Sequence, residues 1–404
     1  MTSSFGWLDN DDEQRRRMIE VVDLFREKGT IDELGIGSIR DTVADSFFPG
    51  TSTLHTRLRY TLFLPWLLQL AAKQGSAREM VSEFRALEHR LIDSLMAGGE
   101  VQGVMGNVAR TELKRLPSVA YWSALRQWGL ADARSSEAFF RRTVDLGALS
   151  HRATASDDPE AREVSLGSGL DAHLPKAPSN LLKSTSFALT SDEEDYLSHR
   201  ISTSTRGSLF AWFIANKPNN VGPGAGDARA NFPWEASNIA DLDSASARLV
   251  EHARRFSSLM HGAALTYNLG LAVKARRDDE ASAHEAALAA WWESDDAEHT
   301  ARTWDRADWW NEISLRNNRL SPRAAAFVDD WVELVSQGFD AVSSERTTLL
   351  IANRERQIKG GRARFYNQAA LDRWSGASGL GRLDFRWGIT TVHLSDLYTA
   401  REAA

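Results

Sequence analysis

The segment from residue 32 to residue 66 constrains the fold of this chain more than any other part of the sequence. It reads DELGIGSIRDTVADSFFPGTSTLHTRLRYTLFLPW. Two short polar blocks lie on either side of a Phe-Phe-Pro-Gly turn, and an apolar run follows the second block directly. An unpaired buried charge is costly, so arginines this close to core-forming residues are expected to have specific partners. We therefore predict a structural polar network here. Its predicted members are Arg40, Asp41, Arg57, Arg59 and Tyr60.

Hydrophobic spacing along most of the chain is that of helices. The clearest case is residues 243–274, where Phe256, Met260 and Tyr267 belong to one apolar stripe. In a helix expected over residues 54–73, Pro65 predicts a kink or a break near Thr61. Further helices are predicted at residues 10–28, 36–44, 77–96, 116–128, from Thr190 onward, and at 280–292, 324–336, 347–356 and 394–402. Residues 383–387 are expected to form a short strand or a turn. The predicted fold is mainly α, a multi-helix globular protein with at most minor β elements.

The length of 404 residues suggests two domains, or one domain with large insertions. Residues 1–150 are predicted to form an N-terminal helical domain. Residues 151–182 are linker-like, because they hold Gly, Pro and Ser clusters with little periodicity. Residues 183–404 are predicted to form a C-terminal helical domain with a basic, Trp-rich tail.

Composition excludes several classes of site. Cysteine is absent, which removes thiolate nucleophiles, iron–sulfur clusters and Cys-based zinc sites. The ten histidines are scattered without ligand spacing, and no phosphate-binding loop of the GxxxxGK type is present, so neither a metal nor a cofactor is expected. The longest apolar stretch, from Tyr60 to Ala72, is too short to span a bilayer. We therefore expect a cytoplasmic protein without a membrane partner.

Glu112-Leu113-Lys114 matches the acid–x–Lys end of a restriction-type nuclease site. Such a site also needs a strand and an upstream carboxylate that holds magnesium. The local pattern is that of a helix or loop, so the sequence favours a solvated surface here and predicts no catalytic residue. An unrecognised metal-dependent nuclease, or another effector enzyme, remains the alternative.

A basic cluster near the C-terminal end is the strongest binding candidate. Guanidinium groups, flexible glycines and aromatic rings suit a nucleic-acid backbone, and they equally suit a protein interface. The third possibility is internal pairing with acids such as Glu355, Asp372 and Asp384. The net charge of −7 indicates that any DNA binding by the chain alone is weak. The candidate residues are Arg354, Arg356, Lys359, Arg362, Arg364, Trp374 and Arg386.

Several sequence blocks together resemble an uncharacterised bacterial domain-of-unknown-function family. The N-terminal blocks are Phe5 to Asp9, Asp32 to Gly35, Ile39 to Asp41, Phe48 to Thr53, Thr56 to Tyr60 and Pro65-Trp66. Later blocks are Leu116 to Ser118, Tyr121-Trp122, Gly262 to Ala264, Tyr267-Asn268, Arg354-Glu355, Trp374 and Arg386-Trp387.

The resemblance implies a setting in anti-phage defence islands, near helicases and nucleases, and it transfers no catalytic residue. It thereby implies a non-catalytic subunit of a defence assembly. Such a subunit would bind a protein partner, a helicase or nuclease subunit, and would contact DNA at most weakly.

Overall fold

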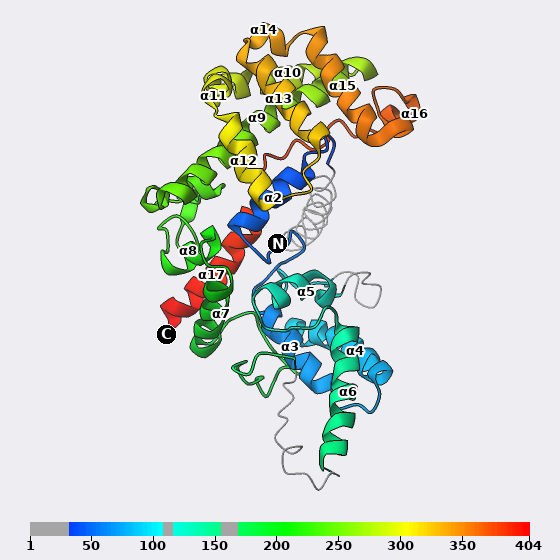
Figure 1. Cartoon of the computed structure of the whole chain (residues 1–404), viewed down its shortest axis with the longest axis vertical. Coiled ribbons are helices and arrows are strands. Elements are labelled where there is room, and N and C mark those ends of the chain that lie inside the picture. The colour runs from blue at the N-terminus through cyan, green and yellow to red at the C-terminus, as the bar shows by residue number, and fades with distance from the viewer. Residues whose placement is uncertain (1–31, 108–115, 155–168) are drawn as a thin grey trace, which may run out of the picture. The chain divides into compact units, whose positions relative to one another are not determined.

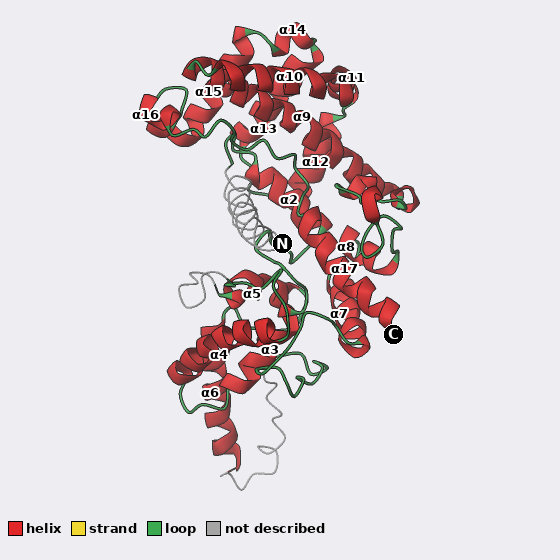
Figure 2. Ribbon diagram, turned by 180° about the vertical axis from the view of Figure 1, so that it is seen from behind, coloured by secondary structure: helices red, strands yellow, loops and turns green. Residues whose placement is uncertain are grey.

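The computed structural model describes residues 32–107, 116–154 and 169–404, and these fall into two compact units. The first unit joins the described residues up to Val43 to Arg248–Leu383, and the second joins Ala44–Ala247 to Asp384–Ala404. In the described ranges the elements are helices and loops without a β-sheet, and an isolated bridge joins Ala131 to Leu170 (Figure 2). The expectation of a mainly α fold with at most minor β structure is confirmed.

The predicted division at residues 150 and 183 does not coincide with the bounds of these units, and it stays a prediction. Residues 155–168 of the linker-like segment, and the whole predicted helix at residues 10–28, lie outside the described residues. Both units are discontinuous in sequence. A linker search that looks for local changes in composition has no means of finding such units.

The first unit is built around the 32-residue helix α9 (Figure 1). Helices α2 and α9 each contribute residues to both units and are described with the first. The helices of this unit are α2 (Gly37–Phe47), α9 (Ser244–Ala275), α10 (Asp278–Ser294), α11 (Ala297–Thr303), α12 (Arg306–Arg316), α13 (Pro322–Ser336), α14 (Phe339–Val342), α15 (Glu345–Lys359), the 3-10 turn η6 (Gly360–Arg362) and α16 (Gln368–Asp372).

Helix α9 confirms the predicted long helix to within one residue at each end. The predicted stripe is buried: Phe256, Met260 and Tyr267 are at most 2% exposed. Two buried tryptophans each donate an indole hydrogen bond to a carbonyl of α9, Trp291 to Ser258 at 2.9 Å and Trp331 to Leu259 at 2.8 Å. Tryptophan therefore contributes both apolar area and a satisfied donor to this core.

Gly262 allows α10 to approach α9 closely. A Cβ atom at this position would lie 2.3 Å from the ring of Trp291, well inside the distance of ordinary contacts. The indole of Trp291 occupies the space that a larger side chain would fill.

The second unit contains two groups of contacting helices (Figure 1). In the first group α3 contacts α4 and α5, and α4 contacts α6; in the second α7, α8 and α17 contact one another. The helices of this unit are α3 (Tyr60–Ala71), α4 (Ala77–Ala97), α5 (Pro117–Gln127), α6 (Ser136–Thr154), α7 (Ser191–Ser204), α8 (Leu209–Ala215) and α17 (Trp387–Ala403), with 3-10 turns η3 (Gly226–Ala228), η4 (Pro233–Glu235) and η5 (Ile239–Asp241).

Helix α3 starts six residues later than the sequence predicted, and Pro65 lies inside it. The prediction of helix at residues 54–59 was wrong because side chains occupy backbone amides there. The amides of Thr56 and Arg57 donate to the Tyr121 hydroxyl at 2.7 and 3.0 Å, and the amide of Leu58 donates to the Asp396 carboxylate at 2.8 Å. These amides are bound by side-chain acceptors instead of carbonyls of a helix, and the helix begins after them.

Two helix starts agree with the prediction to within one residue, at α4 and α7. Ser76 and Thr190 form capping boxes with Glu79 and Glu193, in which each hydroxyl accepts from a backbone amide and each carboxylate accepts in return. Such reciprocal bonds satisfy donors that the first turn of a helix leaves free. Residues 383–387, left open between strand and turn, lead into α17 by a turn with positive φ at Phe385 and Arg386.

The buried stripe of α9 predicts that Met260→Asp is strongly destabilising, because it places a charge in the core of the first unit. We expect the free energy of unfolding to fall by about 3 kcal/mol or more, or the chain to aggregate. Urea denaturation followed by circular dichroism measures this. The matched control is Val273→Asp on the same helix, where the side chain is 63% exposed and little change is expected. Equal stability of the two variants would contradict the placement of Met260.

Candidate functional site

The basic cluster at residues 354–364 divides into residues that face the protein interior and residues that face solvent. Arg354 is 6% exposed, and Lys359 and Arg364 are half-buried. Arg356 and Arg362 are exposed. The two groups therefore have different physical roles, although the sequence presents them as one run.

The half-buried cations belong to an internal network of the first unit. Lys359 lies 2.8 Å from Glu355, and Arg364 donates to Glu33 at 2.8 Å; Lys359 also pairs with Glu33. The Tyr267 hydroxyl donates to Glu355 at 2.6 Å and accepts from Arg364 at 2.7 Å. Burial alone would raise the pKa of Glu355, but its hydrogen bonds from Lys359 and Tyr267 hold that pKa below the usual value. The charges of this network are neutralised internally.

Arg354 is buried without a carboxylate partner among the residues that the structure describes. Its guanidinium donates to the carbonyl oxygens of Leu34 at 2.8 Å and Gly35 at 2.9 Å. One terminal nitrogen, Nη1, makes only longer hydrogen bonds, at 3.3 Å to the Arg323 carbonyl oxygen and 3.4 Å to the Gln357 side-chain amide oxygen. Burial lowers the pKa of Arg354; the nearby carboxylate of Asp32 opposes that shift, and Arg323 adds to it.

The outward residues form an exposed basic and aromatic surface. The guanidinium of Arg356 lies 4.8 Å from the ring centre of Tyr366, which is 48% exposed. Within the described chain neither Arg356 nor Arg362 forms an ion pair. Leu349 and Ile358 on α15 are also exposed. We call Arg356, Arg362, Tyr366 and Leu349 the α15 surface; Ile358 points about 200° away from Arg356 on the helix and is not part of it.

A pocket of about 270 Å³ lies beside this surface, between α13 and α15 of the first unit. Phe327 and Leu350 give it apolar walls, and Arg323, Asn353 and Arg354 line it with polar groups. We call it the α13–α15 pocket. It joins the α15 surface directly, because the Tyr366 hydroxyl donates to the Asn353 side chain at 3.1 Å.

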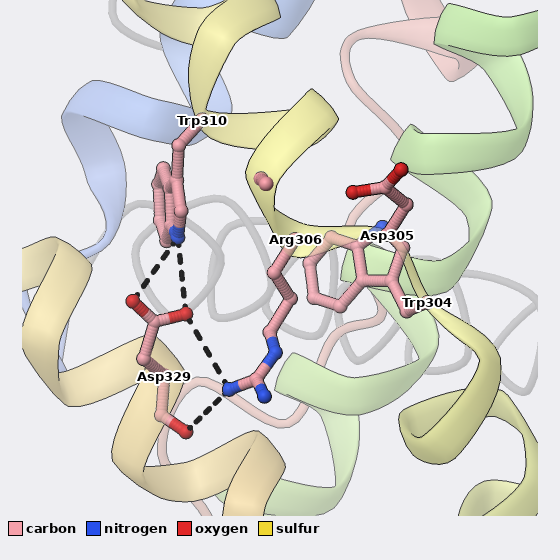
Figure 3. A pocket seen from close by; sticks show the side chains of 6 residues that line it. Trp304, Asp305, Arg306, Trp310 and Asp329 are labelled. Atoms are coloured by element: carbon pink, nitrogen blue, oxygen red, sulfur yellow. Dashed lines mark hydrogen bonds and ion pairs between the residues drawn. The ribbon is translucent and has the colours of Figure 1, made fainter.

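A second, shallower hollow of about 510 Å³ lies at the start of α12 (Figure 3). Figure 3 shows the side chains of Trp310 and Arg306 both pointing at Asp329. The Trp310 indole donates to the Asp329 carboxylate at 3.0 Å, and Arg306 lies 3.7 Å from the same carboxylate. These polar groups satisfy one another, so the hollow offers a ligand less unmet hydrogen bonding than the α13–α15 pocket does.

An aspartate–histidine pair in the first unit has the appearance of a catalytic dyad. The Asp308 carboxylate lies 2.9 Å from Nε2 of His252. The other ring nitrogen, Nδ1, accepts a hydrogen bond from the Trp304 indole at 2.9 Å. An indole nitrogen only donates, so Nδ1 is occupied and cannot take a proton from a nucleophile. This pair is structural.

The remaining binding candidates, Trp374 and Arg386, are both engaged in contacts within their own units. Trp374 is 3% exposed in the core of the first unit, with the Arg277 guanidinium 5.1 Å from its ring centre. Arg386, in the second unit, pairs with Asp45 at 2.6 Å and donates to the Thr51 carbonyl. Their binding role stays a prediction.

Members of the predicted structural polar network have partners within their own units. In the first unit Arg40 pairs with its neighbour Asp41 at 3.0 Å. In the second, Arg59 pairs with Glu193 at 2.7 Å. The hydroxyl of Tyr60 accepts from the Met105 amide at 2.9 Å.

Arg57 forms a half-buried ion pair with the carboxylate of Asp396. Nη2 of Arg57 lies 2.7 Å from the carboxylate of Asp396, and the Asp396 side chain is 6% exposed. Burial raises the pKa of Asp396, although the hydrogen bond from Arg57 opposes that shift. Sequence reasoning missed Asp396, because the only signal for it was the need of Arg57 for an acid somewhere in the chain.

Two stacked histidines are buried in the second unit. The ring centres of His55 and His393 lie 5.4 Å apart, and both residues are fully buried. Both nitrogens of His393 lack a hydrogen-bond partner. Burial lowers the pKa of His55 to about 4 and the pKa of His393 well below its usual 6.5. Both rings are therefore neutral near pH 7.

Metal and membrane sites were searched over the same described ranges. Among residues 32–107, 116–154 and 169–404, no three His, Asp or Glu side chains are gathered so that they would hold a metal ion. None of the helices in these ranges has the length and apolarity needed to cross a bilayer. The candidate nuclease residues Glu112 and Lys114 lie outside the described residues.

Comparison with known families gives one result. The model of a family of unknown function, DUF6361, matches residues 2–401. No curated protein and no solved structure matches the chain.

Asp396→Ala is predicted to destabilise the second unit, because it leaves the Arg57 charge and the Leu58 amide without their acceptor. We expect a loss of about 3–5 kcal/mol in the free energy of unfolding. The control is Glu402→Ala on the same helix, which breaks an exposed pair with Lys217 and should cost less than about 1 kcal/mol. Similar losses for the two variants, measured by chemical denaturation at pH 7, would contradict the role of Asp396.

His393→Leu is predicted to reduce the acid sensitivity of the fold. Because the folded pKa of His393 is depressed, its contribution to stability is present above pH 6.5 and is lost as pH falls below that value. As the pH falls from 7.5 to 4.5, the variant should therefore lose less stability than the wild type does. Burial raises the pKa of Glu88 to about 7, which has the opposite pH dependence. Comparing denaturation of the two proteins at each pH cancels that contribution, and a difference independent of pH would refute the prediction.

Proposed function

We propose, from the premise that the chain belongs to the DUF6361 family of unknown function, that it is a non-catalytic subunit that binds a protein partner through the α15 surface. One observation carries this proposal. Arg356 and Arg362 are exposed and have no ion pair within the described chain, while Lys359 and Arg364 beside them are neutralised internally. Lys359 and Arg364 thus stabilise the fold from inside, whereas Arg356 and Arg362 are available to an acidic group of another molecule.

The chemistry of the α15 surface favours a protein over DNA. Arginine and tyrosine are the residues that most often dominate protein interfaces, and Tyr366 is held in place by Arg356 and Asn353. The exposed Leu349 adds apolar area, which a phosphate backbone does not need. The net charge of −7 further limits DNA affinity. Any DNA binding by the isolated chain is expected to be weak and to fall steeply with salt.

The setting we propose is a cytoplasmic anti-phage defence assembly, with a helicase or nuclease subunit as the partner. This rests on the sequence resemblance described above. The two internal features that look chemical, the Asp308–His252 pair and the hollow at the start of α12, have satisfied polar groups. That supports a binding role rather than a catalytic one for the first unit.

The test is co-expression of the tagged full chain with its genomic neighbours. We expect a neighbour-encoded protein to co-purify with the wild type. The double variant Arg356→Glu/Arg362→Glu should lose at least about ninety per cent of that partner, because charge reversal replaces attraction by repulsion. The control, Arg126→Glu/Arg141→Glu, reverses two exposed arginines of the second unit and should retain it.

Two outcomes would overturn the proposal. One is equal recovery of the partner by both double variants, or no co-purifying neighbour at all. The other is magnesium- or manganese-dependent DNA cleavage by the pure chain that is abolished by Glu112→Ala, since this would make the protein a nuclease.

A further inference from the structure

The α13–α15 pocket has a size that suits one or two amino-acid side chains. Its volume of about 270 Å³ falls just below the range typical of small-molecule sites. It opens beside the α15 surface, to which Asn353 and Tyr366 connect it. A partner docked on that surface therefore lies next to the pocket and can place a side chain in it.

The charged side chains of the pocket favour an acidic ligand group. Arg323 and Arg354 line it, against the single carboxylate of Asp330. The acceptors of Arg354 are neutral oxygens, three main-chain carbonyls and the Gln357 side-chain amide, and its Nη1 makes only the two longest of these hydrogen bonds. A buried guanidinium gains most from an ionised acceptor, because a hydrogen bond to a carboxylate is roughly twice as strong as one between neutral groups.

The apolar walls of the pocket favour a ligand that carries an apolar side chain next to its acidic group. Phe327 and Ala326 of α13 face Leu350 of α15 across it. Leu349, which directly precedes Leu350 on α15, is 52% exposed. An apolar side chain next to the acid would bury this area. A phosphate backbone would bring repeated negative charge past Asp330 and would leave the apolar walls unused.

We propose that the α13–α15 pocket receives an aspartate or glutamate side chain from an acidic–apolar segment of the partner protein. The carboxylate pairs with Arg323 and Arg354, and an adjacent leucine-like side chain packs on Leu349 and Leu350. This inference rests on the proposed function and names the chemistry of the partner. It also assigns a part to the internal residue Arg354 that the α15 surface alone does not give it.

The probe is a displayed library of random twelve-residue peptides, selected on the pure full chain. The pocket is blocked in Ala326→Trp, an exposed lining position where a larger side chain fills the space without entering the core. Arg323→Glu reverses the charge at an exposed position of the rim. The matched control is Ala286→Trp at an exposed site of α10. Thermal unfolding of each variant verifies that it is folded.

Selected peptides are expected to share an aspartate or glutamate next to a large apolar residue. Synthetic copies, measured by fluorescence anisotropy, should bind Ala326→Trp and Arg323→Glu at least about tenfold more weakly than the wild type, and Ala286→Trp within about twofold. Enrichment of peptides without an acid, equal binding to Ala326→Trp and wild type, or tighter binding of a DNA duplex than of the peptides would each overturn the inference.

The two proposals fail in distinguishable ways. If a neighbour-encoded partner is lost from Arg356→Glu/Arg362→Glu but is fully retained by Ala326→Trp, the proposed function stands and the pocket inference is wrong. If acidic–apolar peptides require the pocket but no neighbour co-purifies, the pocket chemistry is supported and the proposed assembly is wrong.

Discussion

Neutralisation of buried charge between segments far apart in sequence is the interaction on which both units depend. In the second unit the Asp396 carboxylate receives Arg57 and the amide of Leu58, across 338 residues for the latter bond. In the first unit Glu33 receives Arg364 across 331 residues. Hydrophobic stripes bring helices together, but they do not determine which helix packs against which. A buried carboxylate has few acceptable positions, so these pairs select the arrangement of the segments within each unit.

Much of the helical structure could be predicted from the sequence, because its causes are local. The stripe through Phe256 and Tyr267 defined α9, and the hydroxyl of Thr190 with the acids after it defined the start of α7. The start of α3 could not be predicted. It is set by the Tyr121 hydroxyl and the Asp396 carboxylate, which capture backbone amides at 2.7–3.0 Å from distant positions. Nothing near residue 58 in the sequence indicates those acceptors.

The candidate site shows the same boundary between local and distant causes. Arg354 and Arg356 are two residues apart on a helix and so point about 200° apart, and that geometry was available from the sequence. Which of the two would face inward was not, because it depends on the carbonyls of Leu34 and Gly35. Gly35 is required there for two reasons: its φ is +66°, and a Cβ atom would lie 2.6 Å from the Arg354 guanidinium. The pocket beside Arg354 also has no sequence signature, since its lining comes from two helices.

Several residues near the N-terminal end are synthesised long before the residues that they contact in the folded protein. Leu34 leaves the ribosome first, yet its carbonyl is bonded by Arg354, 320 residues later. At ordinary synthesis rates that interval is roughly 15–60 seconds. The interval between the synthesis of Arg57 and that of its partner Asp396 is longer, because Asp396 lies 339 residues later in the chain. Throughout that time the apolar side chains of α3 have only part of their final neighbours. The first unit has all its segments only once Leu383 has been made, and the second only once α17 has been made, so the early helices stay without part of their core during most of synthesis.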